Sequence, residues 1–106
     1  MVRQRTCSDG ATSRLELTDI GRPPDQVRVR VRFEVHRSPV GHSWRITLHA
    51  NRPGFLTPNP VVQLTRVASD SGDLAVQVRR WGVSGWVRAK AVDTQTGQVC
   101  RVNAVI

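Results

Sequence analysis

In the segment from Gln26 to Arg37, the residues up to His36 alternate strictly between polar and apolar side chains. Because side chains of a β-strand point alternately to its two faces, this period of two predicts a strand with one dry face and one solvated face. Such a strand is typical of an antiparallel sheet, since the strands of parallel sheets are buried on both faces. The apolar positions are Val27, Val29, Val31, Phe33 and Val35, and the polar positions between them are Arg28, Arg30, Arg32, Glu34 and His36.

Shorter segments repeat this pattern along the chain. Alternation returns around Glu16, from Trp44 to Leu48 and from Leu74 to Val78, and turn-forming Gly, Pro, Asp and Ser residues separate the segments. Seventeen valines favour strands as well. A further strand is expected at 61–67, where Pro58 and Pro60 point to an edge position or to a loop that only then enters the sheet. The strands expected at 86–92 and 98–105 form a hairpin. We therefore predict an all-β fold, an Ig-like or fibronectin-like antiparallel two-sheet sandwich of about seven strands.

The chain has 106 residues, which is the size of one domain. We expect a disordered N-terminal arm at residues 1–6 and a single β-sandwich at 7–106. No apolar run is longer than three residues, so no membrane-spanning segment is expected. The N-terminal residues also lack the hydrophobic stretch of a signal peptide.

Two cysteines, Cys7 and Cys100, lie near the two ends of the chain. An even number of cysteines in a small chain favours a disulfide and an oxidising compartment. Unpaired structural thiols and a reactive cysteine are the alternatives, whereas no pair of ligands has the spacing of a metal site. A disulfide implies a secreted or extracytoplasmic protein, so we expect that a signal segment or a larger parent protein has been cut away before Met1.

The order of several short motifs resembles a group of small exported domains of high-GC, actinobacterial-type bacteria. This resemblance implies a secreted immunoglobulin-like sandwich whose first and last strands are tied by a disulfide, and it implies no activity. The motifs are Cys7-Ser-Asp-Gly10, the charged strand from Val27 to Val35, Gly41-His-Ser-Trp44-Arg-Ile46, the turn Ser71-Gly72 and Thr96-Gly-Gln-Val-Cys100.

The charge of the chain is strongly basic, with 16 Lys and Arg residues against eight Asp and Glu and a net charge of +8. Such an excess attracts polyanions such as nucleic acid or acidic glycans. If the strand at 26–37 lies beside the strand at 74–79, the stripe Arg28, Arg30 and Arg32 neighbours Gln77 and Arg79 on one outer surface. The alternative interpretation is a solvated face that keeps the sheet soluble, in a sequence made arginine-rich by a GC-rich genome.

A second candidate binding surface combines aromatic and basic residues. Trp81 and Trp86 bracket a short loop, Arg79 and Arg80 precede it, and Arg88 follows it. Exposed tryptophans stack on sugars, bases or partner proteins, although a tryptophan at a strand end also covers the open end of a core. The three histidines, His36, His42 and His49, are expected to be exposed and ordinary, because their spacing matches no zinc motif.

No catalytic motif and no cofactor-binding motif is present, so we expect no enzyme and no cofactor. The leading hypothesis is a non-catalytic, secreted binding or structural module that contacts an unknown macromolecule. One alternative is a polyanion-binding domain that uses the arginine-rich face. A second alternative is a subunit that self-assembles through its sheet edges.

Overall fold

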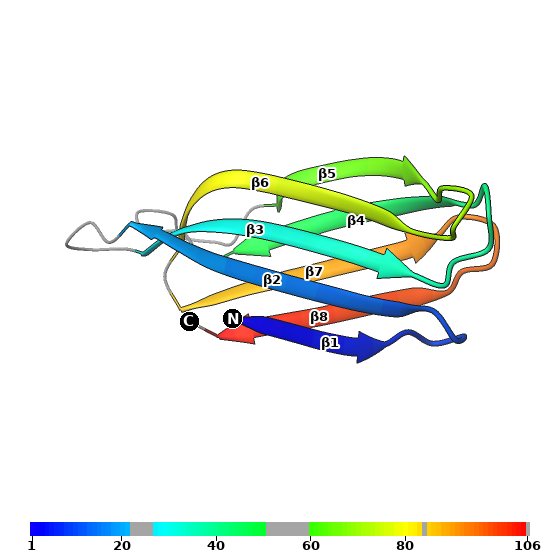
Figure 1. Cartoon of the computed structure of the whole chain (residues 1–106), viewed down its shortest axis with the longest axis horizontal. Helices are drawn as coiled ribbons and strands as arrows, with labels where there is room; N and C mark the ends of the chain where they lie inside the picture. The colour runs from blue at the N-terminus through cyan, green and yellow to red at the C-terminus, as the bar shows by residue number, and fades with distance from the viewer. Residues whose placement is uncertain (22–26, 51–59, 84, 106) are drawn as a thin grey trace.

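The computed structural model describes residues 1–21, 27–50, 60–83 and 85–105. Side chains at positions 20, 21, 27, 28, 60, 61 and 80–82 lie outside this description, as do Gln26 at the start of the predicted strand and Pro58. Eight β-strands run through the described residues (Figure 1). No helix among them is long and apolar enough to cross a membrane. The strands are β1 (Val2–Thr6), β2 (Thr12–Gly21), β3 (Val27–His36), β4 (Ser43–Ala50), β5 (Pro60–Val67), β6 (Leu74–Val83), β7 (Trp86–Asp93) and β8 (Val99–Val105).

The strands form two antiparallel four-stranded sheets, which we call sheet A (order β1-β2-β3-β6) and sheet B (order β5-β4-β7-β8). The neighbours β2-β3-β6 and β4-β7-β8 follow the immunoglobulin order A-B-E and C-F-G, with β5 added beside the C strand. The predicted all-β sandwich is confirmed, as are the edge position of β5 and the β7–β8 hairpin.

The N-terminal residues differ from the prediction. Where a disordered arm was expected at residues 1–6, β1 pairs with β2 along its whole length, from Val2 opposite Glu16 to Thr6 opposite Thr12. Its five side chains are all exposed, so no apolar alternation marked it as a strand. Backbone pairing at the sheet edge forms this eighth strand, and a pattern based on burial does not detect such an edge.

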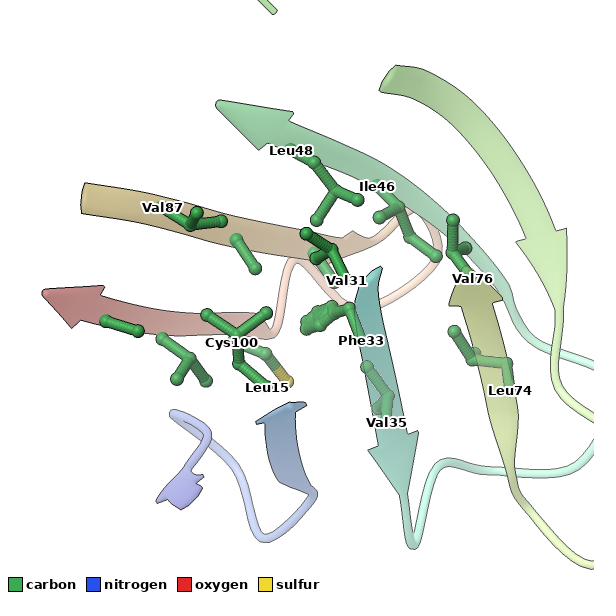
Figure 2. Close-up of a cluster of buried hydrophobic side chains, with 14 of the residues drawn as sticks. Leu15, Val31, Phe33, Val35, Ile46, Leu48, Leu74, Val76, Val87 and Cys100 are labelled. Atoms are coloured by element: carbon green, nitrogen blue, oxygen red, sulfur yellow. The ribbon is translucent and has the colours of Figure 1, made fainter. Parts of the chain in front are cut away.

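The core lies between the inner faces of the two sheets. In β3 the alternation produces the expected burial, because Val29, Val31, Phe33 and Val35 are at most 2% exposed. Figure 2 shows Val31, Phe33 and Val35 in one buried cluster with Ile46 and Leu48 of β4 and Val87 of β7. Trp44, which is fully buried, donates an indole hydrogen bond of 2.7 Å to the Ser38 hydroxyl, so its polar atom is satisfied inside the core.

A disulfide between Cys7 and Cys100 links the two sheets, as predicted. Cys7 directly follows β1 and Cys100 lies in β8, two strands that sit side by side at one edge of the sandwich (Figure 1). Two hydrogen bonds lie beside the bridge: the Ser8 backbone N–H donates to the Val99 carbonyl oxygen, and the Val99 backbone N–H donates to the Ser8 hydroxyl. The Gln98 side chain adds to this junction by accepting hydrogen bonds from the backbone N–H groups of Asp9 and Ala11.

Candidate functional site

The arginine stripe of β3 lies on the outer face of sheet A. As predicted, β3 pairs with β6, and Arg32 stands opposite Gln77. A bulge shifts the pairing between Val29 and Val31, so that Arg79 and Arg80 of β6 both stand opposite Arg30. Arg30, Arg32 and Arg79 are exposed, whereas the side chains of Arg28 and Arg80 lie outside the described residues.

Carboxylates on the same face neutralise part of this stripe. Arg32 Nε lies 2.6 Å from a Glu34 oxygen, and Arg14 of β2 lies 2.8 Å from Glu16 and 3.5 Å from Glu34. Burial acts to raise the pKa of Glu34, but hydrogen bonds from Arg32 and His36 outweigh it and lower the pKa below its ordinary value. The stripe is therefore a mixed network of both signs, and its capacity to hold an external anion is reduced.

His36 extends this network to the loop before β6. Its two ring nitrogens lie 2.8 Å from Glu34 and 2.8 Å from Asp73. The hydrogen bond to Asp73 is the main cause that raises the pKa of His36; burial opposes it, and the bond to Glu34 supports it. The same contact lowers the pKa of Asp73.

The outer face of sheet B carries a different charge pattern. The inward residues of its strands, such as Leu48, Ala89 and Val102, are buried, so the residues between them point outward. Five outward residues have basic side chains: Arg45 and His49 of β4, Arg88 and Lys90 of β7, and Arg101 of β8. We call this surface the basic face; its other outward residues include Gln63, Thr65, Thr47, Trp86 and Asn103.

The acidic residues of the described strands lie away from the basic face. Glu16 and Glu34 belong to the outer face of sheet A, Asp19 lies in β2 of the same sheet, and Asp93 at the end of β7 is fully buried. Within the described residues, none of the ion pairs joins Arg45, Arg88, Lys90 or Arg101 to a carboxylate. The positive charge of this face therefore remains available to a ligand.

Strand register concentrates the basic side chains at the centre of the sheet. Lys90 stands directly opposite Arg101 on one side and Thr47 on the other, and Arg88 stands opposite His49 and Asn103. Like charges directly opposite each other in an antiparallel pair destabilise the sheet. An anion placed between Lys90 and Arg101 would remove that repulsion.

A shallow groove of about 440 Å³ crosses the centre of the basic face. It runs over β4, β7 and β8, and its lining combines three cationic side chains with neutral hydrogen-bonding groups. The lining residues are Thr47, His49, Arg88, Ala89, Lys90, Arg101 and Asn103.

The predicted aromatic and basic cluster is divided between the sheets, which corrects the expectation of one cluster. Arg79, Arg80 and Trp81 belong to β6 of sheet A, while Trp86 and Arg88 belong to β7 of sheet B. The Trp81 side chain lies outside the described residues. Trp86 is half-buried at the end of the basic face, and the Arg88 guanidinium carbon lies 4.3 Å from its ring centre, in a cation–π contact.

The histidines differ from the expected exposed, ordinary state, because all three are half-buried. His36 binds two carboxylates, His49 lines the groove, and His42 Nδ1 lies 2.8 Å from buried Asp93. Burial acts to raise the pKa of Asp93, but this hydrogen bond and those from the Gln95 and Thr96 backbone lower it. No group of three or more potential metal ligands was found where the structure describes the chain.

Three residues of the basic face were not among the candidates chosen from the sequence: Arg45, Lys90 and Arg101. A usable signal was the difference in acidic content, since segments 43–50, 86–92 and 98–105 contain no Asp or Glu while segment 26–37 contains Glu34.

Chemically, the basic face offers charge-assisted hydrogen bonds to an anion and neutral hydrogen bonds beside them. The groove on this face is open and crosses three strands, so it suits an extended ligand better than an enclosed small molecule. Comparisons of the chain with family models, with curated proteins and with solved structures give no match.

Proposed function

We propose that this chain is a non-catalytic, exported binding module that holds an anionic polymer against the outer face of sheet B. One observation carries the proposal: five basic side chains share that face, and the carboxylates of the described strands lie elsewhere. The basic face replaces the arginine stripe as the main binding surface. Two of the residues singled out in the sequence, Trp86 and Arg88, belong to it.

The physical basis of binding is the release of counterions. A polyanion carries condensed cations, and each basic side chain that replaces one of them adds a favourable, salt-dependent contribution to affinity. A surface with unpaired basic side chains gains this contribution in full. On sheet A, Arg32 would first have to give up part of its interaction with Glu34.

Export is part of the proposal because of the disulfide. Disulfides persist in oxidising compartments and are rare where cellular reductants keep thiols reduced. The Cys7–Cys100 bridge is consistent with an extracytoplasmic location. Polymers with many acidic groups are common ligands at cell surfaces and outside cells, where such a module would work.

The test compares two matched pairs of substitutions. Lys90→Gln with Arg101→Gln removes two charges from opposite positions on β7 and β8, and Arg30→Gln with Arg79→Gln removes two from adjacent strands of sheet A. Both variants carry the same net charge. Binding of heparin is measured by isothermal titration calorimetry at several salt concentrations, and urea unfolding checks that both variants fold.

We expect the Lys90/Arg101 variant to bind heparin at least tenfold more weakly at physiological salt. The slope of log affinity against log salt should fall by about 1.5, since each lost contact removes roughly 0.7 to 0.9. The Arg30/Arg79 variant should stay within about threefold of the parent chain. Equal losses in both variants would show that net charge alone attracts the polymer, and the proposed face would be wrong.

A further inference from the structure

The arrangement of neutral groups in the groove narrows the ligand class. We infer that the polymer is an acidic polysaccharide, a chain of sugar rings that carry carboxylate or sulfate groups beside free hydroxyls. This inference rests on the proposed function and concerns the same basic face. It goes further in choosing sugar polymers over nucleic acids and polyphosphates.

The shape of the groove suits one extended chain. Its walls are two rows of side chains that cross the strands: Thr47, Lys90 and Arg101 form one row, and His49, Arg88 and Asn103 form the other. Residues two apart along a strand are separated by about 6.6 to 6.8 Å, so this distance separates the two rows. A single polymer chain lying across β4, β7 and β8 would contact both rows at once.

The chemistry of the two rows alternates charge with neutral hydrogen bonding. Lys90 stands opposite the Thr47 hydroxyl, and Arg88 stands opposite the Asn103 amide. Arginine and lysine only donate hydrogen bonds, whereas a hydroxyl and an amide both donate and accept. A sugar that carries an acid group and neighbouring hydroxyls satisfies both kinds of partner, but a polyphosphate chain offers acceptors alone.

The aromatic content of the basic face also favours sugars. Binding of single-stranded nucleic acid uses several aromatic rings on which successive bases stack. Within the described part of the basic face Trp86 is the one aromatic side chain, and Arg88 lies over its ring. One tryptophan with an arginine over its ring does not form such a series of stacking rings, so this face suits sugar rings better than stacked bases.

The test uses four probes that differ in these properties. Polygalacturonate carries carboxylates and hydroxyls, heparin carries sulfates and hydroxyls, and inorganic polyphosphate and oligo-dT carry phosphates. The variant Thr47→Val with Asn103→Ala removes the neutral groups of the groove and keeps every charge. Its matched control, Thr18→Val with Gln77→Ala, makes similar changes at exposed positions on sheet A.

We expect the Thr47/Asn103 variant to bind the preferred glycan about tenfold more weakly, as the loss of two hydrogen bonds predicts. Its affinity for polyphosphate and oligo-dT should change less than twofold, and the control variant should match the parent chain with all four probes. Preference for polygalacturonate or for heparin would identify the acid group as carboxylate or sulfate.

Two failures can be told apart. The choice of a sugar polymer is wrong if polyphosphate or oligo-dT binds more tightly than both glycans. It is also wrong if the Thr47/Asn103 variant loses no affinity for the two glycans. The Lys90/Arg101 variant would still weaken binding in that case, and the proposed function would stand. If no probe depends on Lys90 and Arg101, the proposed function fails together with this inference.

Discussion

Reduction of the disulfide between Cys7 and Cys100 should strongly destabilise the fold. The two residues are separated by 93 positions, so the bridge closes nearly the whole chain into one loop. In the chain-entropy model, a loop of this length restricts the unfolded state by about 4 to 5 kcal/mol at 25 °C. This is a large share of the net stability of a small domain, which is about 5 to 15 kcal/mol.

The native state should tolerate reduction with little rearrangement. Both cysteines are buried, and hydrogen bonds between Ser8 and Val99 hold their two segments together without the bridge. The loss in stability should therefore arise almost entirely from the greater freedom of the unfolded chain. The melting temperature should fall by roughly 20 °C or more.

The assay is urea unfolding followed by tryptophan fluorescence, to which buried Trp44 contributes, with and without reductant. The dependence of the unfolding free energy on urea should become steeper after reduction, because the open chain exposes more surface when it unfolds. A Cys7→Ala/Cys100→Ala variant controls for effects of the reductant and should not respond to it. A difference of less than about 1 kcal/mol, with both thiols titratable after reduction, would refute the loop-closure argument.

Two further changes test the loop contacts and the charge network. Gly72→Ala should cost about 2 to 3 kcal/mol in urea unfolding, because Gly72 has φ +78° and an added Cβ would lie 2.5 Å from the Ser38 carbonyl oxygen. Gly97→Ala, at φ +77° with open space around it, should cost clearly less, and equal losses would contradict the steric explanation. The raised pKa of His36 should stabilise the fold fully below about pH 6.5 and lose this contribution as pH rises through the raised value. NMR titration of the His36 ring and urea unfolding at several pH values measure this; a His36→Gln variant that keeps the same pH dependence above pH 6.5 would contradict it.

The strands that the sequence predicts best are those with one buried and one exposed face. Val29 to Val35 alternate in burial as expected, and the same holds for Trp44 to Leu48 and for the inward residues of β7. Apolar periodicity records burial directly, because each inward residue must leave water for the fold to be stable. β1 escaped prediction for the same reason, since all five of its side chains are exposed.

The candidate site was harder to predict because neighbouring strands are brought together by long-range pairing. The pairing of Arg14 with Glu34 and of His36 with Asp73 follows from the order and register of β2, β3 and β6. No local pattern states which arginine will find a carboxylate on the next strand.

The sequence by itself determined that the chain forms half-buried strands, among them the one from Trp44 to Leu48, and that the two cysteines suit a bridge between the chain ends. Each of these depends on local alternation or on residue type, which a linear sequence contains. Only the tertiary structure decided that Lys90 faces Arg101 beside Thr47, and that Glu16 of β2 and Glu34 of β3 share the outer face of sheet A. Strand register sets which outward side chains become neighbours, and register is established by the packing of the whole sandwich.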